Sequence, residues 1–127
     1  MKGGNEQDRT RDFDLQDRLI DFAVRVISVV ENLPNSQIGK HIAGQLPRAG
    51  TSPAANYGEA RSAESQRDFI HKLKIALKEL RETHVWLLMI QRKPLIEPQE
   101  KLSLIISECN ELISILVTSI RTAEKNK

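Results

Sequence analysis

Two glutamates and three histidines are the side chains of this chain best suited to acid–base or metal chemistry. Glu59 and Glu82 could act as paired carboxylates, or as ligands of a two-metal site inside a helical bundle. Bundles that hold two iron ions use Glu-x-x-His on their helices, and the sequence contains no such motif. His41, His71 and His84 share no common pattern. We therefore predict no catalytic residue, no metal site and no cofactor.

A polar segment around Glu59 favours a structural interpretation. In RAGTSPAANYGEA, residues 48 to 60, Arg48, Ser52, Asn56 and Glu59 recur at helical spacing on the side expected to face a bundle. Buried polar groups need hydrogen-bond partners, so we predict a network between two helices. In this network Arg48 should bind Glu59, Glu79 or Glu82, and Asn56 could also satisfy backbone groups freed by Pro47 and Pro53. The predicted members are Arg48, Ser52, Asn56, Glu59, Glu79 and Glu82.

The composition predicts helices as the elements that position these side chains. Glycine and proline are sparse, and Leu, Ile, Ala, Lys, Arg and Glu dominate the 127 residues. We expect a flexible tail over residues 1–13, one bundle domain over 14–123 and a C-terminal tail over 124–127. The fold class is all-α, an antiparallel up-and-down four-helix bundle.

Four apolar stripes and their flanking signals place the helices. Asp14 should cap the first helix, Ser36 the second, and Ser65 with Asp68 the third. Pro47 interrupts the second helix, where we predict a kink or break, and Pro53 could restart it. The predicted stripes are Leu15, Leu19, Phe22, Val26, Val29 and Leu33; Ile38, Ile42 and Ala49, with Leu46 at the border; Phe69, Leu73, Ala76, Leu80, Thr83 and Leu87; and Leu102, Ile106, Cys109, Ile113, Leu116 and Ile120.

Two sequence blocks carry a resemblance to a known family. The first is RxGTS..AN..EA, here Arg48, Gly50, Thr51, Ser52, Ala55, Asn56, Glu59 and Ala60, and the second is K-E-x-x-E-T, here Lys78, Glu79, Glu82 and Thr83. The pair resembles the proteins encoded within intervening sequences of bacterial 23S ribosomal RNA genes, over roughly residues 14 to 120. Pro47 stands where an aliphatic residue is expected, and Ala49 where serine is frequent. The resemblance implies a four-helix bundle that assembles as a homopentamer, has no enzymatic activity, and is related to a basic, nucleic-acid-binding accessory protein of diversity-generating retroelements.

A basic stripe on the third helix indicates a nucleic-acid surface. Residues 40 to 93 contain ten Lys plus Arg against five Asp plus Glu. The helical period aligns Arg67, Lys74, Lys78, Arg81 and Arg92 on one face. Such a row can follow the phosphates of RNA or DNA without reading bases, although an ordinary solvated face would carry the same residues.

An apolar stripe on the first helix indicates self-association. Ile20, Val24 and Ile27 recur on the side away from its core stripe, where a monomer should be polar. They fit a subunit contact, unless the second helix or the N-terminal segment covers them.

Two function classes stay open. The first is a nucleic-acid-associated oligomer, and the second is an adaptor whose assembly binds another protein without nucleic-acid affinity. The lone Cys109 and the lack of a long apolar run predict a cytoplasmic protein that does not contact membranes.

Overall fold

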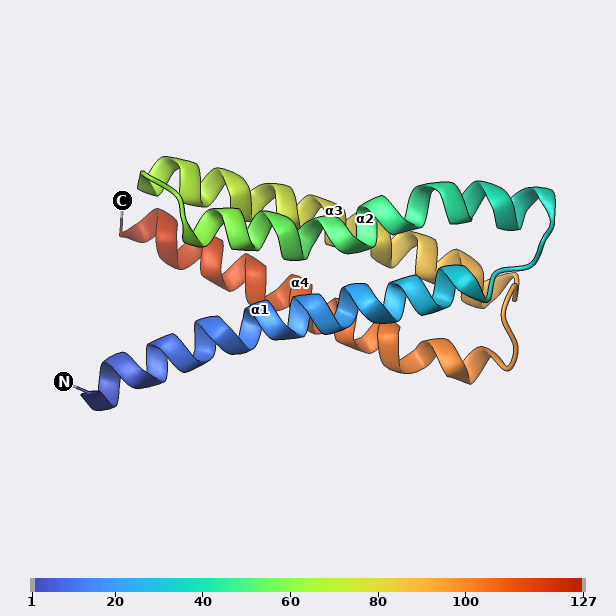
Figure 1. Ribbon diagram of the computed structural model, residues 1–127, viewed down its shortest axis with the longest axis horizontal. Helices are drawn as coiled ribbons and strands as arrows, with labels where there is room; N and C mark the ends of the chain where they lie inside the picture. Colours follow the sequence, from blue (N-terminus) through green and yellow to red (C-terminus); the bar gives the residue numbers. More distant parts are fainter. Residues whose placement is uncertain (1, 127) are drawn as a thin grey trace.

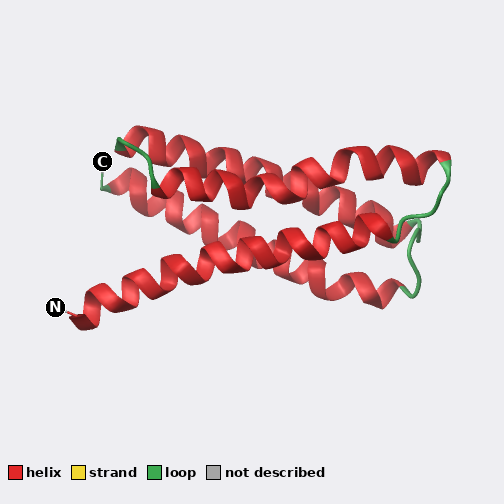
Figure 2. Ribbon diagram, viewed as in Figure 1, coloured by secondary structure: helices red, strands yellow, loops and turns green. Residues whose placement is uncertain are grey.

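The protein folds as an up-and-down bundle of antiparallel helices. The structure, a computed structural model, describes the backbone of residues 2–126 and the side chains of residues 14–126. Within that part, the elements are α1 (Lys2–Glu31), α2 (Gln37–Arg61), α3 (Gln66–Arg92), a short 3₁₀ turn η1 (Gln99–Leu102) and α4 (Ser103–Lys125). Successive helices run in opposite directions, with two connections at one end and one at the other (Figures 1 and 2). The predicted all-α four-helix bundle is confirmed.

Two helices begin at the serines that the sequence indicates. The Ser36 hydroxyl accepts a hydrogen bond of 3.1 Å from the Gly39 N–H. The Ser65 hydroxyl accepts one of 3.0 Å from the Asp68 N–H. Each hydroxyl satisfies one of the backbone donors that a helix leaves open in its first turn.

The outer helices extend beyond their predicted ends. α1 begins at Lys2, so the predicted start at Asp14 is wrong, and α4 continues past residue 124 to Lys125. Residues 5–13 contain no proline or glycine, so nothing in that stretch stops the helix. The side chains of residues 1–13 lie outside the described part, and the flexibility of that segment stays a prediction.

The α2 helix runs unbroken through two prolines. It spans Gln37–Arg61 with Pro47 and Pro53 inside it, so the predicted break does not occur, while the predicted kink stays a prediction. Each proline removes one backbone hydrogen bond. The flanking helices α1 and α3 both pack against α2, and the Thr51 hydroxyl bonds the Pro47 carbonyl at 2.7 Å. Packing on two sides keeps the chain helical where local propensity would end it.

The core joins one stripe from each helix. The fully buried positions include Leu19 and Phe22 of α1, Leu46 of α2 and Leu80 of α3. Thr83 is a buried polar residue in this layer, and its hydroxyl donates to the Glu79 carbonyl at 2.8 Å. The prediction that Ile38 belongs to the buried stripe of α2 is wrong, because its side chain is exposed. Leu46, which was predicted at the border of that stripe, is fully buried.

One stretch has the length and composition of a membrane span. Gln99–Lys125 is long and apolar enough to cross a bilayer by those two criteria alone, which the sequence prediction overlooked. The α4 helix buries Cys109, Leu112 and Leu116 in the bundle core. A core helix that is mostly buried passes the same test, whereas 28% of this stretch is buried in the bundle.

Candidate functional site

The polar residues in the middle of α2 bind within their own helix. The Asn56 side-chain amide donates to the Ser52 hydroxyl at 2.8 Å and to the Ser52 carbonyl at 3.1 Å. Both residues are half-buried. Their predicted place in a network between helices is wrong, and so is the predicted role of Asn56 at carbonyls freed by the prolines. A residue four positions earlier on the same helix lies within reach of a short side chain, so it satisfies Asn56 first.

Arg48 joins α2 to α3 through two carboxylates. Its guanidinium binds Glu79 at 2.7 Å and Glu82 at 2.8 Å. The Trp86 indole N–H also donates to Glu82, at 3.1 Å. The hydrogen bond to Glu79 is the main cause that raises the pKa of Arg48. Arg48 is exposed, so this link joins the two helices at the surface, where an ion pair contributes little to stability.

Glu59 makes a separate ion pair. It accepts a 2.7 Å hydrogen bond from the Lys72 ammonium group, and its side chain is exposed. The predicted link to Arg48 is absent because Arg48 lies three helical turns earlier on α2. Glu59 and Glu82 therefore bind different cations and do not form a carboxylate pair.

The three histidines have different surroundings. His41 packs edge-on against Trp86 with ring centroids 5.9 Å apart, and His71 is exposed. His84 Nε2 is buried without a hydrogen-bond partner among the described residues. Across the described part of the chain, no three His, Cys, Asp or Glu side chains gather where they could hold a metal ion.

The basic residues of α3 form an open surface. Arg67, Lys74, Lys78, Arg81 and Arg92 are all exposed. Lys74 binds Glu124 of α4 at 3.0 Å, which neutralises one of the five charges. None of the other four has an ion pair within residues 14–126. Four cations along one helix face remain available to an anion.

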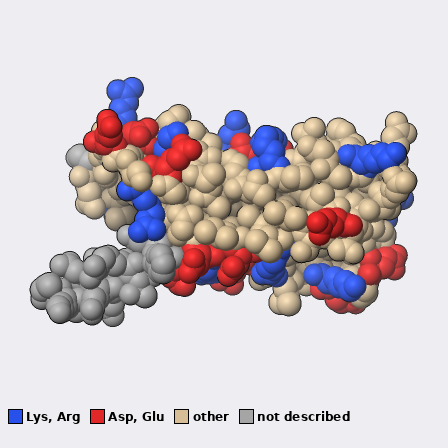
Figure 3. Space-filling model, in the orientation of Figure 1, with Lys and Arg blue, Asp and Glu red and all other residues tan. Residues whose placement is uncertain are grey.

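The apolar stripe of α1 is exposed to solvent. Ile20, Val24 and Ile27 are 45%, 55% and 42% exposed. Neither α2 nor any other described element covers them. Figure 3 shows that the face over α1 and α2 is mostly uncharged through its centre. An uncharged face with branched apolar side chains suits contact with another protein surface.

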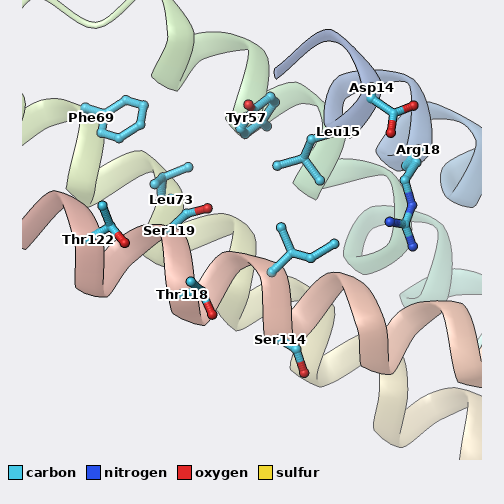
Figure 4. Close-up of a pocket in the computed structure, with 11 residues that line it drawn as sticks. Asp14, Leu15, Arg18, Tyr57, Phe69, Leu73, Ser114, Thr118, Ser119 and Thr122 are labelled. Atoms are coloured by element: carbon cyan, nitrogen blue, oxygen red, sulfur yellow. The ribbon is translucent and has the colours of Figure 1, made fainter. Parts of the chain in front are cut away.

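The bundle has a groove at one end, which the sequence analysis did not predict. It encloses about 840 Å³ and is lined by Asp14, Leu15, Arg18, Tyr57, Phe69, Leu73, Ser114, Ile115, Thr118, Ser119 and Thr122. These side chains come from all four helices, with Arg18 near one end and Phe69 near the other (Figure 4). The sequence signal for this groove was the row of serines and threonines along one side of α4, at positions where a tightly packed helix would have apolar residues.

The cation at the groove is neutralised by two carboxylates of α4. Arg18 bonds Glu108 at 2.9 Å and Glu111 at 3.0 Å, which joins α1 to α4. The hydrogen bond to Glu108 is the main cause that raises the pKa of Arg18. The groove therefore combines an apolar floor with hydroxyl groups, the paired cation of Arg18 and the carboxylate of Asp14.

The chain matches the model of one protein family. The family described as 23S rRNA-intervening sequence protein matches residues 11–118. A similar solved structure is that of a protein of unknown function from the S23 ribosomal protein family of Bacteroides thetaiotaomicron VPI-5482, with 37% identity and a TM-score of 0.78. The alignment covers 87% of this chain and 97% of the other. No curated protein matches the chain.

Proposed function

Because the chain belongs to the 23S rRNA-intervening sequence protein family, we propose that it is a non-enzymatic bundle that self-assembles and binds nucleic acid nonspecifically. The observation that supports nucleic-acid binding is the row of exposed α3 cations, four of them without an ion pair in the described part. A row spaced along several helical turns can neutralise successive phosphates. Self-assembly would repeat the row and multiply the number of phosphates that it reaches.

A salt titration tests the basic row. We expect a labelled single-stranded RNA to bind at low salt, and binding to weaken about ten-fold in the double variant Lys78→Gln/Arg81→Gln. The slope of log affinity against log salt should fall by roughly 0.7 for each phosphate that the variant no longer neutralises. The matched control is Lys40→Gln, which removes one exposed cation from α2. No binding by the natural protein at low salt, or equal weakening in the control, would rule out this surface.

The exposed stripe on α1 supports self-assembly. Burying Ile20, Val24 and Ile27 against a second copy would remove three apolar side chains from water. The family resemblance implies five copies. A closed ring repeats one head-to-tail contact, so at every interface the stripe of one copy would pack against a different surface of the next copy.

Light scattering tests the stripe. We expect the natural protein to have the mass of an oligomer and the variant Ile20→Asp/Val24→Asp to have that of a monomer, because two carboxylates cannot be buried unpaired at the contact. The control is Leu104→Asp, which changes an exposed apolar residue on α4. Helical content by circular dichroism should be the same in all three. A monomeric natural protein, or an oligomeric variant, would contradict the proposal.

A further inference from the structure

A second exposed apolar patch lies at the other side of the bundle. We call Ile38, Val85 and Met89 the end patch, and they are 48%, 50% and 49% exposed. Val85 and Met89 are one turn apart on α3. Ile38 lies one turn before His41, whose ring meets Trp86 of α3 at 5.9 Å. Because α2 and α3 run in opposite directions, Ile38 lies at about the same level along the bundle as Met89.

The end patch is bordered by Trp86, whose ring is held in place by its neighbours. Trp86 is half-buried between His41 and the carboxylate of Glu82, to which its indole N–H donates at 3.1 Å. Glu82 is itself held by Arg48. The ring is therefore fixed before any partner arrives, which limits the entropy cost of binding.

Positive charge lies at both ends of the end patch. Arg81 precedes Val85 by one turn, and Arg92 follows Met89 by about one turn on the same face. Both are exposed, and neither has an ion pair among residues 14–126. The nearby carboxylate of Glu82 is already bound to Arg48. A partner that covers the apolar side chains would therefore bring its own acidic groups to the two arginines.

The shape and chemistry favour a helix over a nucleic acid as the partner. Ile, Val and Met offer aliphatic surface, whereas single-stranded nucleic acids stack their bases on aromatic faces. An amphipathic helix lays apolar residues spaced by three and four into such a surface. Methionine adapts to side chains of different shape. We propose that the end patch binds an acidic amphipathic helix of a partner protein, which goes beyond nucleic-acid binding and gives an adaptor function a specific surface.

A synthetic peptide tests this proposal. The probe is a fluorescein-labelled helix of about 16 residues with leucine at positions i, i+4 and i+7 and glutamate in the flanking turns. Fluorescence anisotropy should show saturable binding to the natural protein. The variant Val85→Ser/Met89→Ser should bind about ten-fold more weakly, and so should the same peptide with lysine in place of glutamate.

The control variant is Leu104→Ser, which removes an exposed apolar residue from α4 and should bind the peptide as the natural protein does. RNA binding should survive in Val85→Ser/Met89→Ser, because that variant keeps Arg81 and Arg92, which belong to the basic row. Three results would overturn the proposal: no peptide binding at several hundred micromolar, equal binding of the glutamate and lysine peptides, or equal binding by the natural protein and the end-patch variant. A change of mass in that variant would also overturn it, since the end patch would then be a contact between copies.

Discussion

Replacing Gly50 by valine is expected to lower the free energy of unfolding by about 3 kcal/mol or more. A β-carbon at this position would lie 2.5 Å from Val26 Cγ1 and 2.9 Å from Val26 Cγ2. Carbon atoms in contact are normally about 3.5 to 4 Å apart. Valine adds two further methyl groups at the same place, so α1 and α2 would have to separate.

Space, and not backbone conformation, demands glycine at this position. Gly50 has no positive φ angle and lies inside the continuous α2 helix. Val26 is fully buried, so its side chain cannot turn into solvent to make room. A shift of α1 would in turn disturb Phe22 and Leu19, which lie on the same buried stripe of α1.

Gly44 is the matched control on the same helix. A β-carbon there meets nothing within 4 Å, so Gly44→Ala should raise the free energy of unfolding by about 1 kcal/mol through helix propensity alone. In the double variant Val26→Ala/Gly50→Ala, removal of the valine methyls should recover part of the stability that Gly50→Ala alone takes away. Urea unfolding followed by circular dichroism measures the natural protein and these four variants, Gly50→Val included. Equal effects of alanine at positions 44 and 50 would show that the two helices are not in tight contact.

The fold was predictable because apolar periodicity and capping act locally. The spacing of Leu73, Leu80 and Leu87 places them on one side of α3, and the buried side is that one. Ser36 and Ser65 each act on a backbone N–H three residues away, so their role can be read from the sequence. Interactions of this range need no knowledge of the neighbouring helices.

Features that depend on the neighbouring helices could not be predicted in the same way. Local rules predict that α2 ends at Pro47. The helix continues past this proline because α2 packs against both α1 and α3. The closeness of Gly50 to Val26 depends on how two helices cross. The groove depends on how α1 and α4 lie relative to each other, because it is lined by residues of both. Asn56 is the opposite case: a nearer partner, Ser52, replaced the distant one that the polar pattern indicated.

The only cysteine of the chain has an environment that suppresses its reactivity. Cys109 is fully buried, and its thiol lies 3.4 Å from the Leu80 carbonyl, to which it donates. Burial, and to a lesser extent the negative charge of Glu108, raises the pKa of the thiol to about 12. Only the thiolate is an effective nucleophile. At pH 8 we therefore expect iodoacetamide to modify folded Cys109 at least about 10³-fold more slowly than the urea-unfolded chain, whose thiol has a pKa of about 8.5.

The same shift makes stability depend on pH. Above about pH 8.5 the unfolded chain loses the thiol proton, while the folded protein keeps it until about pH 12, so rising pH favours unfolding. The free energy of unfolding should fall by about 1.4 kcal/mol per pH unit above 8.5 through this group, or about 2 kcal/mol at pH 10. Cys109→Ala should lack this component, whatever its stability at pH 7. Urea unfolding of both proteins between pH 7 and 10 measures the difference in slope. Parallel curves, or rapid alkylation of the folded protein, would mean that the thiol is reached by water and that α3 and α4 are not closed over it.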